Sequence, residues 1–378
     1  MGPYKANADG TISYVGNKIF EPVKNINDVK YTKEEALLRV RDLSEKPLWG
    51  RIAKINNQIF ESTVEFFSEM KSKFTLLPLT TRMISSPGAV YGKEAINFTT
   101  DTSPITLDWF NLKRKAFLAE SSQIYLELSL LQENIDHVYC IYNSFRKEKG
   151  DATHLSEFHH IEYEGKVNQE ENELIAQKLT QKILFDILKK NKEDIEYFLT
   201  EKQLKELENI AKNMLTTKKI TFKEAMNALY ENTKNEKYKE FTMNDRFGSW
   251  EEIRLTEVFD SLLIIKEYPL LEVPFYHAYK EGKNPAVADN SDFIWPGYRE
   301  FLGSGHRIGS EEELDKKAEI FNLPKEDYTP YLQSRELPNY EETSGFGLGW
   351  ERLLQGILCL PFIWNTNQFP RVDITLKP

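Results

Sequence analysis

The sequence predicts an α+β fold built around a mostly antiparallel sheet. Strand patterns occur in the middle and in the last third of the chain, and helical patterns lie between them. Residues 170–239 contain neither proline nor glycine and read as helices rich in lysine and glutamate. With 378 residues, 40% of them hydrophobic, the chain is long enough to bury a large core.

The sequence pattern changes near residue 45, which separates an N-terminal extension from the rest of the chain. Residues 1–45 are polar and weakly patterned, and we expect an N-terminal extension with one short helix at Lys33–Leu43. Apolar residues then recur at helical spacing over Trp49–Phe74, which predicts one long amphipathic helix. The strand expected in FTLLPLTTRMI is interrupted by Pro78, which suits a sheet edge or an interface. We expect residues 46–378 to form one domain.

The remaining strands and helices fall within this domain. Strands are expected at Ala116–Leu118, Val138–Tyr142, Glu157–Glu164, Pro274–Tyr279, Ser291–Ile294, Glu300–Leu302 and Gly345–Leu348. A helix at Trp350–Leu360 follows the last strand, and residues 170–240 form a predicted helical insertion of two to four helices.

Composition and charge exclude several classes of protein. No apolar run approaches the roughly 20 residues of a membrane helix, and MGPYKANADG lacks the basic start and apolar stretch of a secretory signal. Cys140 and Cys359 lie in apolar surroundings, so we expect reduced thiols in a cytoplasmic protein. The net charge of −10 argues against a protein whose main task is to grip RNA phosphates.

The segment FRKEKGDATHLSEFHHIEYE concentrates polar groups on one expected strand. Alternation places its side chains on two faces, with Glu157, His159, Ile161 and Tyr163 on one and Phe158, His160, Glu162 and Glu164 on the other. Burying such carboxylates is costly without a ligand or a partner. Taken alone, the segment favours a salt-bridged surface hairpin, and a binding site is the alternative.

Two glycine-rich segments also combine charge with close backbone approach. DFIWPGYREFLGSGHRI contains Asp292, Glu300 and Arg307, a set that suits Mg²⁺ with a polyphosphate or, alternatively, a loop with an ion pair. SGFGLGWERLL is an expected junction between strand and helix whose glycines allow close contact with a ligand, and it places Arg352 in the first helical turn.

Together these segments resemble the class II aminoacyl-tRNA synthetases. FRKE…HLSEFHHIEYE resembles motif 2 of that family, GFGLGWERLL motif 3, and the helix ending in LLPLTT motif 1. LAESSQIYLE and the closing LPFIWNTNQFPR resemble the aspartyl and asparaginyl branch, and the asparaginyl enzymes most. The resemblance covers roughly residues 48–378. It implies an antiparallel sheet of six or seven strands flanked by helices, and a homodimer formed through motif 1.

The resemblance also implies ATP and Mg²⁺ as ligands. The implied ATP-binding residues are Arg146, Glu148, His154, Phe158, Glu300 and Arg352, and the implied metal ligands are Asp292 and Glu300. Arg146 is implied to hold the α-phosphate and the substrate carboxylate, and Arg352 to hold the γ-phosphate with His154 nearby; the two arginines are the implied catalytic residues. Glu148 is implied to receive the adenine amino group and Phe158 to stack on the adenine.

An amino-acid site is implied as well, formed by Ser121, Gln123, Glu127, His160, Glu162 and Arg307. Within it, Gln123 and Glu162 are implied to take the α-ammonium group, while Glu127 and Arg307 read the side chain. Aspartyl enzymes place a lysine where this chain has Leu126. The resemblance therefore implies asparagine rather than aspartate as the substrate.

Three features depart from the family pattern. Only about 45 residues precede motif 1, too few for the family's anticodon-binding barrel. The motif 2 loop reads KGDAT, with Asp151 where asparaginyl enzymes are basic. The segment SSPGA at residues 85–89 lacks the glutamate with which the family helps to hold the α-ammonium group.

These departures predict an enzyme that keeps the ATP chemistry and changes the acceptor. We expect activation of asparagine as its adenylate with release of pyrophosphate, then transfer to ammonia or a small amine without tRNA; aspartate or an analogue are the other candidate substrates. A compact asparagine–tRNA ligase is the alternative. A regulatory protein that binds ATP without turnover is a second alternative, against which the retained charged residues count. The expected partners are small molecules and a second copy of the chain, with no membrane.

Overall fold

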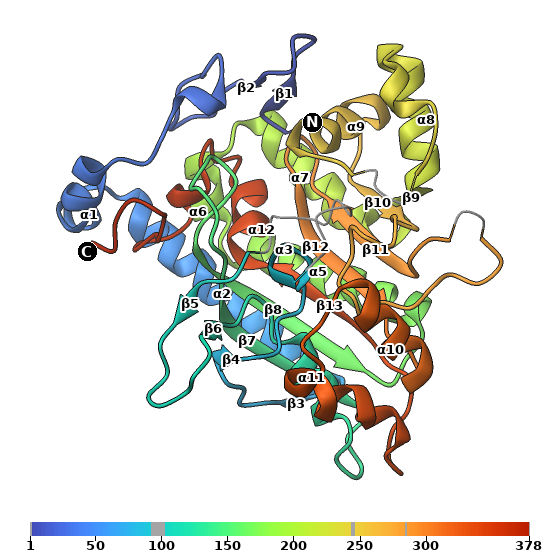
Figure 1. Ribbon diagram of the computed structural model, residues 1–378. Coiled ribbons are helices and arrows are strands. Elements are labelled where there is room, and N and C mark those ends of the chain that lie inside the picture. Colours follow the sequence, from blue (N-terminus) through green and yellow to red (C-terminus); the bar gives the residue numbers. More distant parts are fainter. Residues whose placement is uncertain (1, 92–102, 243–245, 284–285, 378) are drawn as a thin grey trace.

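The computed structural model of the chain describes residues 2–91, 103–242, 246–283 and 286–377. An eight-stranded sheet runs through its centre and is flanked by helices (Figure 1). The predicted α+β class is confirmed, with slightly more strands than the six or seven expected.

The large sheet is antiparallel except at its two edges. Its strand order is β3 (Lys73–Phe74), β7 (His137–Phe145), β8 (Glu157–Gly165), β13 (Ser344–Gly349), β12 (Glu300–His306), β11 (Asn290–Ile294), β10 (Leu263–Lys266) and β9 (Lys218–Thr221). Only the pairs β3–β7 and β9–β10 are parallel. Smaller sheets join β4 (Thr80–Thr81), β6 (Ala116–Leu118) and β5 (Thr106–Leu107), and β1 (Tyr4–Ala6) with β2 (Ile12–Tyr14).

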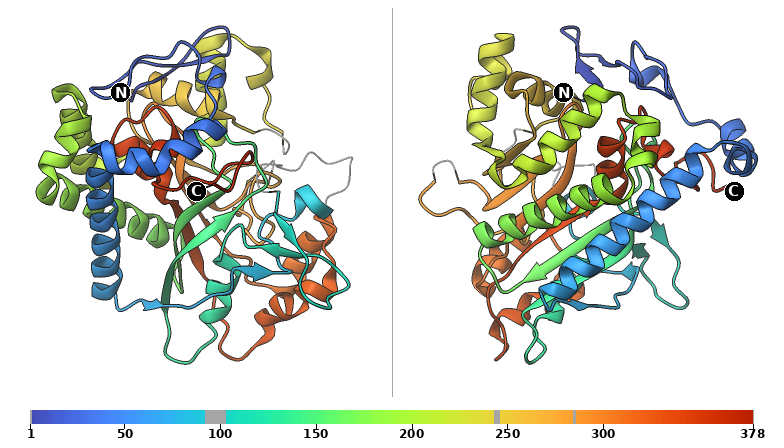
Figure 2. Two further views of the ribbon diagram at one scale, coloured as in Figure 1. Left: turned by 90° about the vertical axis from the view of Figure 1, so that its left-hand side faces the viewer. Right: turned by 180° about the vertical axis from the view of Figure 1, so that it is seen from behind.

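The helices form layers around this sheet. They are α1 (Lys33–Glu45), α2 (Leu48–Glu69), α3 (Gly88–Tyr91), α4 (Gln123–Ser129), α5 (Gln169–Lys190), α6 (Lys192–Phe198), α7 (Glu201–Asn213), α8 (Phe222–Thr233), α9 (Ser249–Phe259), α10 (Glu311–Ile320), α11 (Lys325–Leu332) and α12 (Trp350–Ile357). Short 3₁₀ turns lie at Ile26–Asp28, Met214–Thr216, Glu236–Tyr238, Gln333–Glu336 and Ile363–Asn365. The long helices α2 and α5 lie side by side across one face of the sheet (Figure 2).

Strand β8 separates the helix-covered face from a cavity. Tyr163 points toward the helices, where its ring lies 5.7 Å from that of Phe67 in α2. Phe158, His160 and Glu162 lie on the opposite face and line the cavity. This is the alternation that the sequence predicts for the segment, and it places the polar face of β8 at the site.

The N-terminal segment packs onto the end of α12. The hydroxyl group of Tyr14 donates to the carbonyl oxygen of Cys359 at 2.8 Å, and that of Tyr4 donates to the carbonyl of Pro361. Both tyrosines are buried. Cys140 and Cys359 are buried, unpaired thiols, as predicted.

Several expected elements differ from the structure. The helix expected at Trp350–Leu360 ends at Ile357, and the expected helical insertion at residues 170–240 includes strand β9 of the large sheet. The strand predicted at Pro274–Tyr279 is wrong, because the backbone N–H of His277 donates back to the carbonyl of Pro274 at 3.1 Å and forms a turn. The helix predicted at Trp49–Phe74 ends earlier, at Glu69, since Lys71 adopts a left-handed φ of 60°. Among the described helices, none has the length and apolar run needed to cross a bilayer.

Candidate active site

The cavity lies over the polar face of β8, and strands β11, β12 and β13 contribute to it. Most of the residues singled out in the sequence line this cavity: Ser121, Gln123, Arg146, Glu148, His154, Phe158, His160, Glu162, Asp292, Glu300 and Arg352. Glu127 and Arg307 are not among the lining residues. The fold therefore brings eleven side chains from distant segments into one hollow.

Arg146 and Glu148 follow directly after β7 and face the cavity with atoms that lack partners. The guanidinium carbon of Arg146 lies 5.2 Å from the ring centre of Phe158. Its Nε, and Oε1 of Glu148, are buried without a hydrogen-bond partner among the described residues. Buried polar atoms of this kind are rare in folded proteins, so a donor and an acceptor are available here for a bound ligand.

His154 bridges Asp151 of the KGDAT loop and Arg299, which also lines the cavity. Its Nε2 lies 2.7 Å from Nη1 of Arg299, and its Nδ1 lies 2.9 Å from Oδ1 of Asp151. Because a guanidinium only donates, Nε2 must accept and Nδ1 must carry the proton. Burial opposes ionisation of Asp151, but the hydrogen bonds from His154 and from the Thr153 backbone, together with the charge of Arg299, hold its pKa well below the usual range. The Asp151 charge is thus compensated within the protein.

Asp292 and Glu300 converge on neighbouring strands at one end of the cavity. A Cβ atom added at Gly303 would lie 2.8 Å from Oε1 of Glu300 and 3.5 Å from Oδ1 of Asp292, so the glycine keeps the space between them open. Burial, followed by the charges of Glu300 and Glu252, raises the pKa of Asp292 well above its usual value.

The two carboxylates fit a divalent cation. Mg²⁺ prefers hard oxygen ligands and is commonly held by one or two carboxylates plus phosphate oxygens and water. No cluster of three or more metal-ligating side chains occurs in the described ranges. A cation at this end would therefore be shared between Asp292, Glu300 and a phosphate-bearing ligand.

Arg352 adds positive charge beside this pair. Its Nη1 donates to the carbonyl oxygen of Glu300 at 2.9 Å, which fixes the guanidinium against β12. Glu162 also lines the cavity. Its two carboxylate oxygens accept hydrogen bonds from Ser121 Oγ at 2.5 Å and from the Ser122 backbone N–H at 2.7 Å. Burial, then the nearby charge of Arg146, lowers the pKa of His160 well below its usual value. The imidazole of His160, which also lines the cavity, is therefore neutral.

Gln123 lines the cavity as well and is held in place by a hydrogen bond. Its Oε1 accepts from the hydroxyl group of Tyr276 at 3.0 Å, which orients the amide and leaves Nε2 as a donor. A free donor suits an oxygen atom of a ligand better than an ammonium group.

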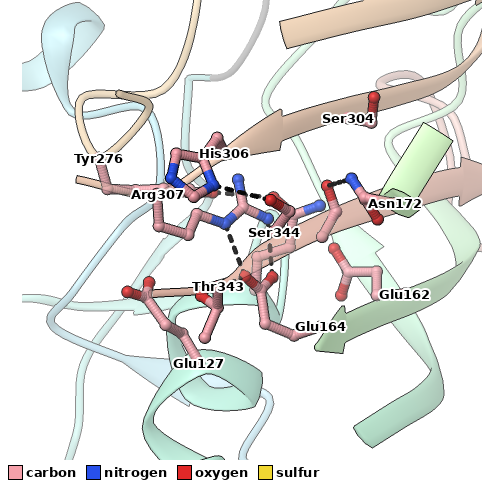
Figure 3. A network of polar contacts seen from close by, with 12 residues as sticks. Glu127, Glu162, Glu164, Asn172, Tyr276, Ser304, His306, Arg307, Thr343 and Ser344 are labelled. Atoms are coloured by element: carbon pink, nitrogen blue, oxygen red, sulfur yellow. Dashed lines mark hydrogen bonds and ion pairs between the residues drawn. The ribbon is translucent and has the colours of Figure 1, made fainter. Parts of the chain in front are cut away.

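Arg307 and Glu127, which the family resemblance implies to read the substrate side chain, are engaged in closed ion pairs. Arg307 is fully buried and binds Glu164 through two hydrogen bonds of 2.8 and 2.7 Å (Figure 3). Thr343 donates a further hydrogen bond to Glu164. Glu127 pairs with Arg335 and accepts from the hydroxyl group of Tyr331. Neither charge is free to face the cavity.

Glu120, Tyr276 and His277 are among the lining residues that were not singled out from the sequence. Glu120 and Tyr276 were passed over, and His277 was read as an ordinary structural residue. The Nε2 atom of His277 lies 2.8 Å from Arg307 Nη1, and its Nδ1 lacks a partner among the described residues. The partners that define these roles lie far away in the chain, so no local pattern could reveal them.

Comparisons with known proteins agree with this architecture. The profile of the family described as "tRNA synthetases class II (D, K and N)" matches residues 34–373. A protein of Desulforamulus reducens named asparagine–tRNA ligase is 29% identical over 345 residues, 89% of this chain and 74% of that protein. Its counterpart in Koribacter versatilis is 30% identical over 346 residues, 89% of this chain and 73% of that protein.

Solved structures show the same fold. The asparaginyl-tRNA synthetase of Pyrococcus horikoshii, complexed with asparaginyl-adenylate, superposes with a TM-score of 0.78 at 23% identity and covers 100% of this chain and 83% of its own. An aspartyl-tRNA synthetase of Entamoeba histolytica gives 0.70 at 21% identity, over 93% of this chain and 64% of its own.

Gly303→Ala tests the proposed cation site. The added methyl group displaces the Glu300 carboxylate but meets only the end of a flexible side chain, so the fold is retained. We expect calorimetry to show Mg·ATP binding weakened by about tenfold, roughly 1.4 kcal/mol. Gly50→Ala, which meets no atom within 4 Å, is the matched control. Unchanged Mg·ATP binding in the Gly303 variant would contradict the assignment.

Glu164→Gln tests the closed pair with Arg307. Removing one partner leaves a buried, uncompensated guanidinium, which costs about 3–5 kcal/mol. Urea unfolding is expected to show a loss of that size. The surface pair of Lys166 with Glu341, whose side chain is 63% exposed, provides the control Glu341→Gln, with an expected change below about 1 kcal/mol. Equal losses of unfolding free energy in both variants would contradict the claim that the buried pair of Arg307 with Glu164 contributes more to stability than a surface pair.

Proposed function

Since the chain belongs to the class II tRNA synthetases of the D, K and N group, we propose that it activates asparagine with ATP as an enzyme-bound aminoacyl-adenylate and transfers it to tRNA. The observation that carries the proposal is the joint placement of Arg146, Arg352 and the Asp292–Glu300 pair in one cavity. This set combines guanidinium groups for phosphates with hard oxygen ligands for a cation.

The first reaction is an in-line displacement at the α-phosphorus of ATP. An oxygen of the amino-acid carboxylate forms a bond to phosphorus, the bond to the bridging oxygen breaks, and pyrophosphate leaves with the electron pair. No general base is required because the attacking carboxylate is already ionised. Arg146 offers an unpaired donor to the charge that develops on the α-phosphate.

Other lining residues orient ATP. Phe158 presents its ring and Glu148 an unpaired carboxylate oxygen, which suit the face and the amino group of adenine. Arg352, held by the carbonyl of Glu300, provides charge for the terminal phosphates. When bound, Mg²⁺ neutralises phosphate charge and helps pyrophosphate to leave. Asp292 and Glu300 are the residues that hold it in this proposal.

Charge pairing supports asparagine over aspartate. Arg307, which the resemblance implies in the side-chain pocket, is already neutralised by Glu164. Leu126 is fully buried and brings no charge. A second substrate carboxylate would be desolvated without a free cation, whereas a neutral carboxamide avoids that cost.

A second candidate acceptor is a small amine. The motif 2 loop is anchored to the C-terminal segment, because the Gly150 backbone N–H donates to Oδ1 of Asp373 at 2.9 Å and the Ser156 N–H donates to the Arg371 carbonyl at 2.8 Å. A loop held in this way, in a chain of net charge −10, offers less to a tRNA acceptor end.

We also propose a homodimer. Phe60 of α2, Phe74 and Leu76 are exposed apolar side chains around motif 1, and Leu76 is 82% exposed. Burial of these side chains against a second copy favours association. The cytoplasmic location expected from the sequence stays a prediction.

ATP–pyrophosphate exchange with each standard amino acid tests the proposal. We expect exchange with asparagine, and charging of tRNA when it is added. Arg146→Gln removes the donor to the α-phosphate and should lower exchange by at least about 100-fold. Arg41→Gln, at a surface residue paired with Glu45, is the control and should keep full activity.

Adding different acyl acceptors distinguishes transfer to tRNA from transfer to a small amine. Asparagine-dependent exchange without tRNA charging, together with amide formation from ammonia or hydroxylamine, would favour the small-amine reaction. No exchange with any amino acid would contradict the proposed activation.

A further inference from the structure

Glu120 is a buried carboxylate that the roles described so far leave unused. It follows β6, is 1% exposed, and lines the cavity. Its Oε1 accepts a hydrogen bond from the Ser86 backbone N–H, which ties it to the neighbouring loop. Its Oε2 has no hydrogen-bond partner among the described residues. An unpaired buried carboxylate oxygen facing a cavity calls for a donor from a ligand.

Arg146 presents the opposite feature in the same cavity. Its Nε is buried and unpaired within the described chain. Arg146 lies close enough for its charge to act on Glu120, yet Oε2 of Glu120 and Nε of Arg146 both lack a hydrogen-bond partner among the described residues. The cavity thus holds a cation and an anion that face a common space without neutralising each other.

The charges around Glu120 explain its ionisation. Burial raises the pKa of Glu120 to about 7. Hydrogen bonds from the Ser86 and Ser85 backbone and the charge of Arg146 oppose this rise, whereas the charge of Glu148 adds to it. Tyr328 of α11 also interacts with it electrostatically. A ligand ammonium group would supply the missing positive charge.

An acidic and an amide group that also line the cavity are already occupied. Both oxygens of Glu162 accept from Ser121 and Ser122, and Oε1 of Gln123 accepts from Tyr276. Glu148 keeps a free oxygen, but its carboxylate lies 4.0 Å from His154, in the part of the site assigned to adenine. Glu120 is therefore the acidic group best able to receive a cation next to Arg146.

We infer that Glu120 and Arg146 together bind the two charged groups of a free α-amino acid, with Glu120 accepting from the α-ammonium group and Arg146 binding the carboxylate. In such a zwitterion the two charges are separated by a single carbon, which matches an unpaired anion and cation that share one space. The inference rests on the proposed function and adds a binding residue to it.

Glu120→Gln is a sharp test, because the amide has the same shape. The amide oxygen can still accept from the Ser86 N–H, while the NH₂ group replaces the free acceptor with a donor. We expect the KM for asparagine in exchange to rise about 30-fold, the loss expected for one charge-assisted hydrogen bond. The KM for ATP should stay within about twofold. Glu133→Gln, at an exposed residue, is the control.

The pH profile and a substrate analogue distinguish binding from a structural role. In the unmodified protein, kcat/KM for asparagine should fall as pH drops below about 7, because Glu120 becomes protonated, and Glu120→Gln should lose this dependence. The desamino analogue of asparagine has no ammonium group. Its affinity should therefore be the same, within about twofold, in both proteins. A comparable loss for asparagine and the analogue would overturn the inference in favour of a structural role.

Calorimetric titration with asparagine separates this inference from the proposed function. If the unmodified protein binds asparagine but shows no exchange, activation is contradicted, and the loss of binding in Glu120→Gln still decides the role of Glu120. Equal asparagine affinity in both proteins would overturn the inference while leaving activation intact. Absence of asparagine binding to the unmodified protein would overturn both.

Discussion

Strand β8 buries Glu162 and Glu164 on one face of the central sheet, and moving a carboxylate out of water costs several kcal/mol unless donors or a cation replace the lost water. The surrounding elements meet this constraint in two ways. The charge of Glu164 is compensated by the guanidinium group of Arg307 and by a hydrogen bond from Thr343. Glu162 instead accepts hydrogen bonds from the Ser121 hydroxyl group and the Ser122 backbone N–H, which lie in the turn before α4. The strands and loops around β8 are held in positions that satisfy these charges.

The cavity beside β8 is the part of this face where compensation is incomplete. Glu120, Arg146 and Glu148 each keep an unpaired atom, and Asp292 and Glu300 repel each other. Such groups destabilise the free protein, but they are already oriented when a ligand arrives. A nucleotide, a cation and an amino acid together supply the charges and donors that the cavity lacks. The same unpaired groups therefore provide the binding energy for the ligand and are already oriented to receive it.

Part of this arrangement could be predicted from the sequence. The alternation of β8 and the position of the glycine-rich strand β13 depend on neighbours in the chain, so local patterns were sufficient. The engagement of Arg307 by Glu164 and of Glu127 by Arg335 could not be foreseen, because each pair joins residues more than a hundred positions apart. The turn at Pro274–His277 was misread as a strand for a related reason, since its apolar residues are buried by packing against α10 and α11 rather than by sheet pairing.

Proton release on ligand binding tests the central claim that a ligand completes the charge pairing of the cavity. A stable sulfamoyl analogue of asparaginyl-adenylate can be titrated calorimetrically at pH 6.5 in buffers with different ionisation enthalpies. Because burial raises the pKa of Glu120 to about 7, pairing with the ligand ammonium group should release a fraction of a proton. Tight binding with no proton release, or with proton uptake, would contradict the account.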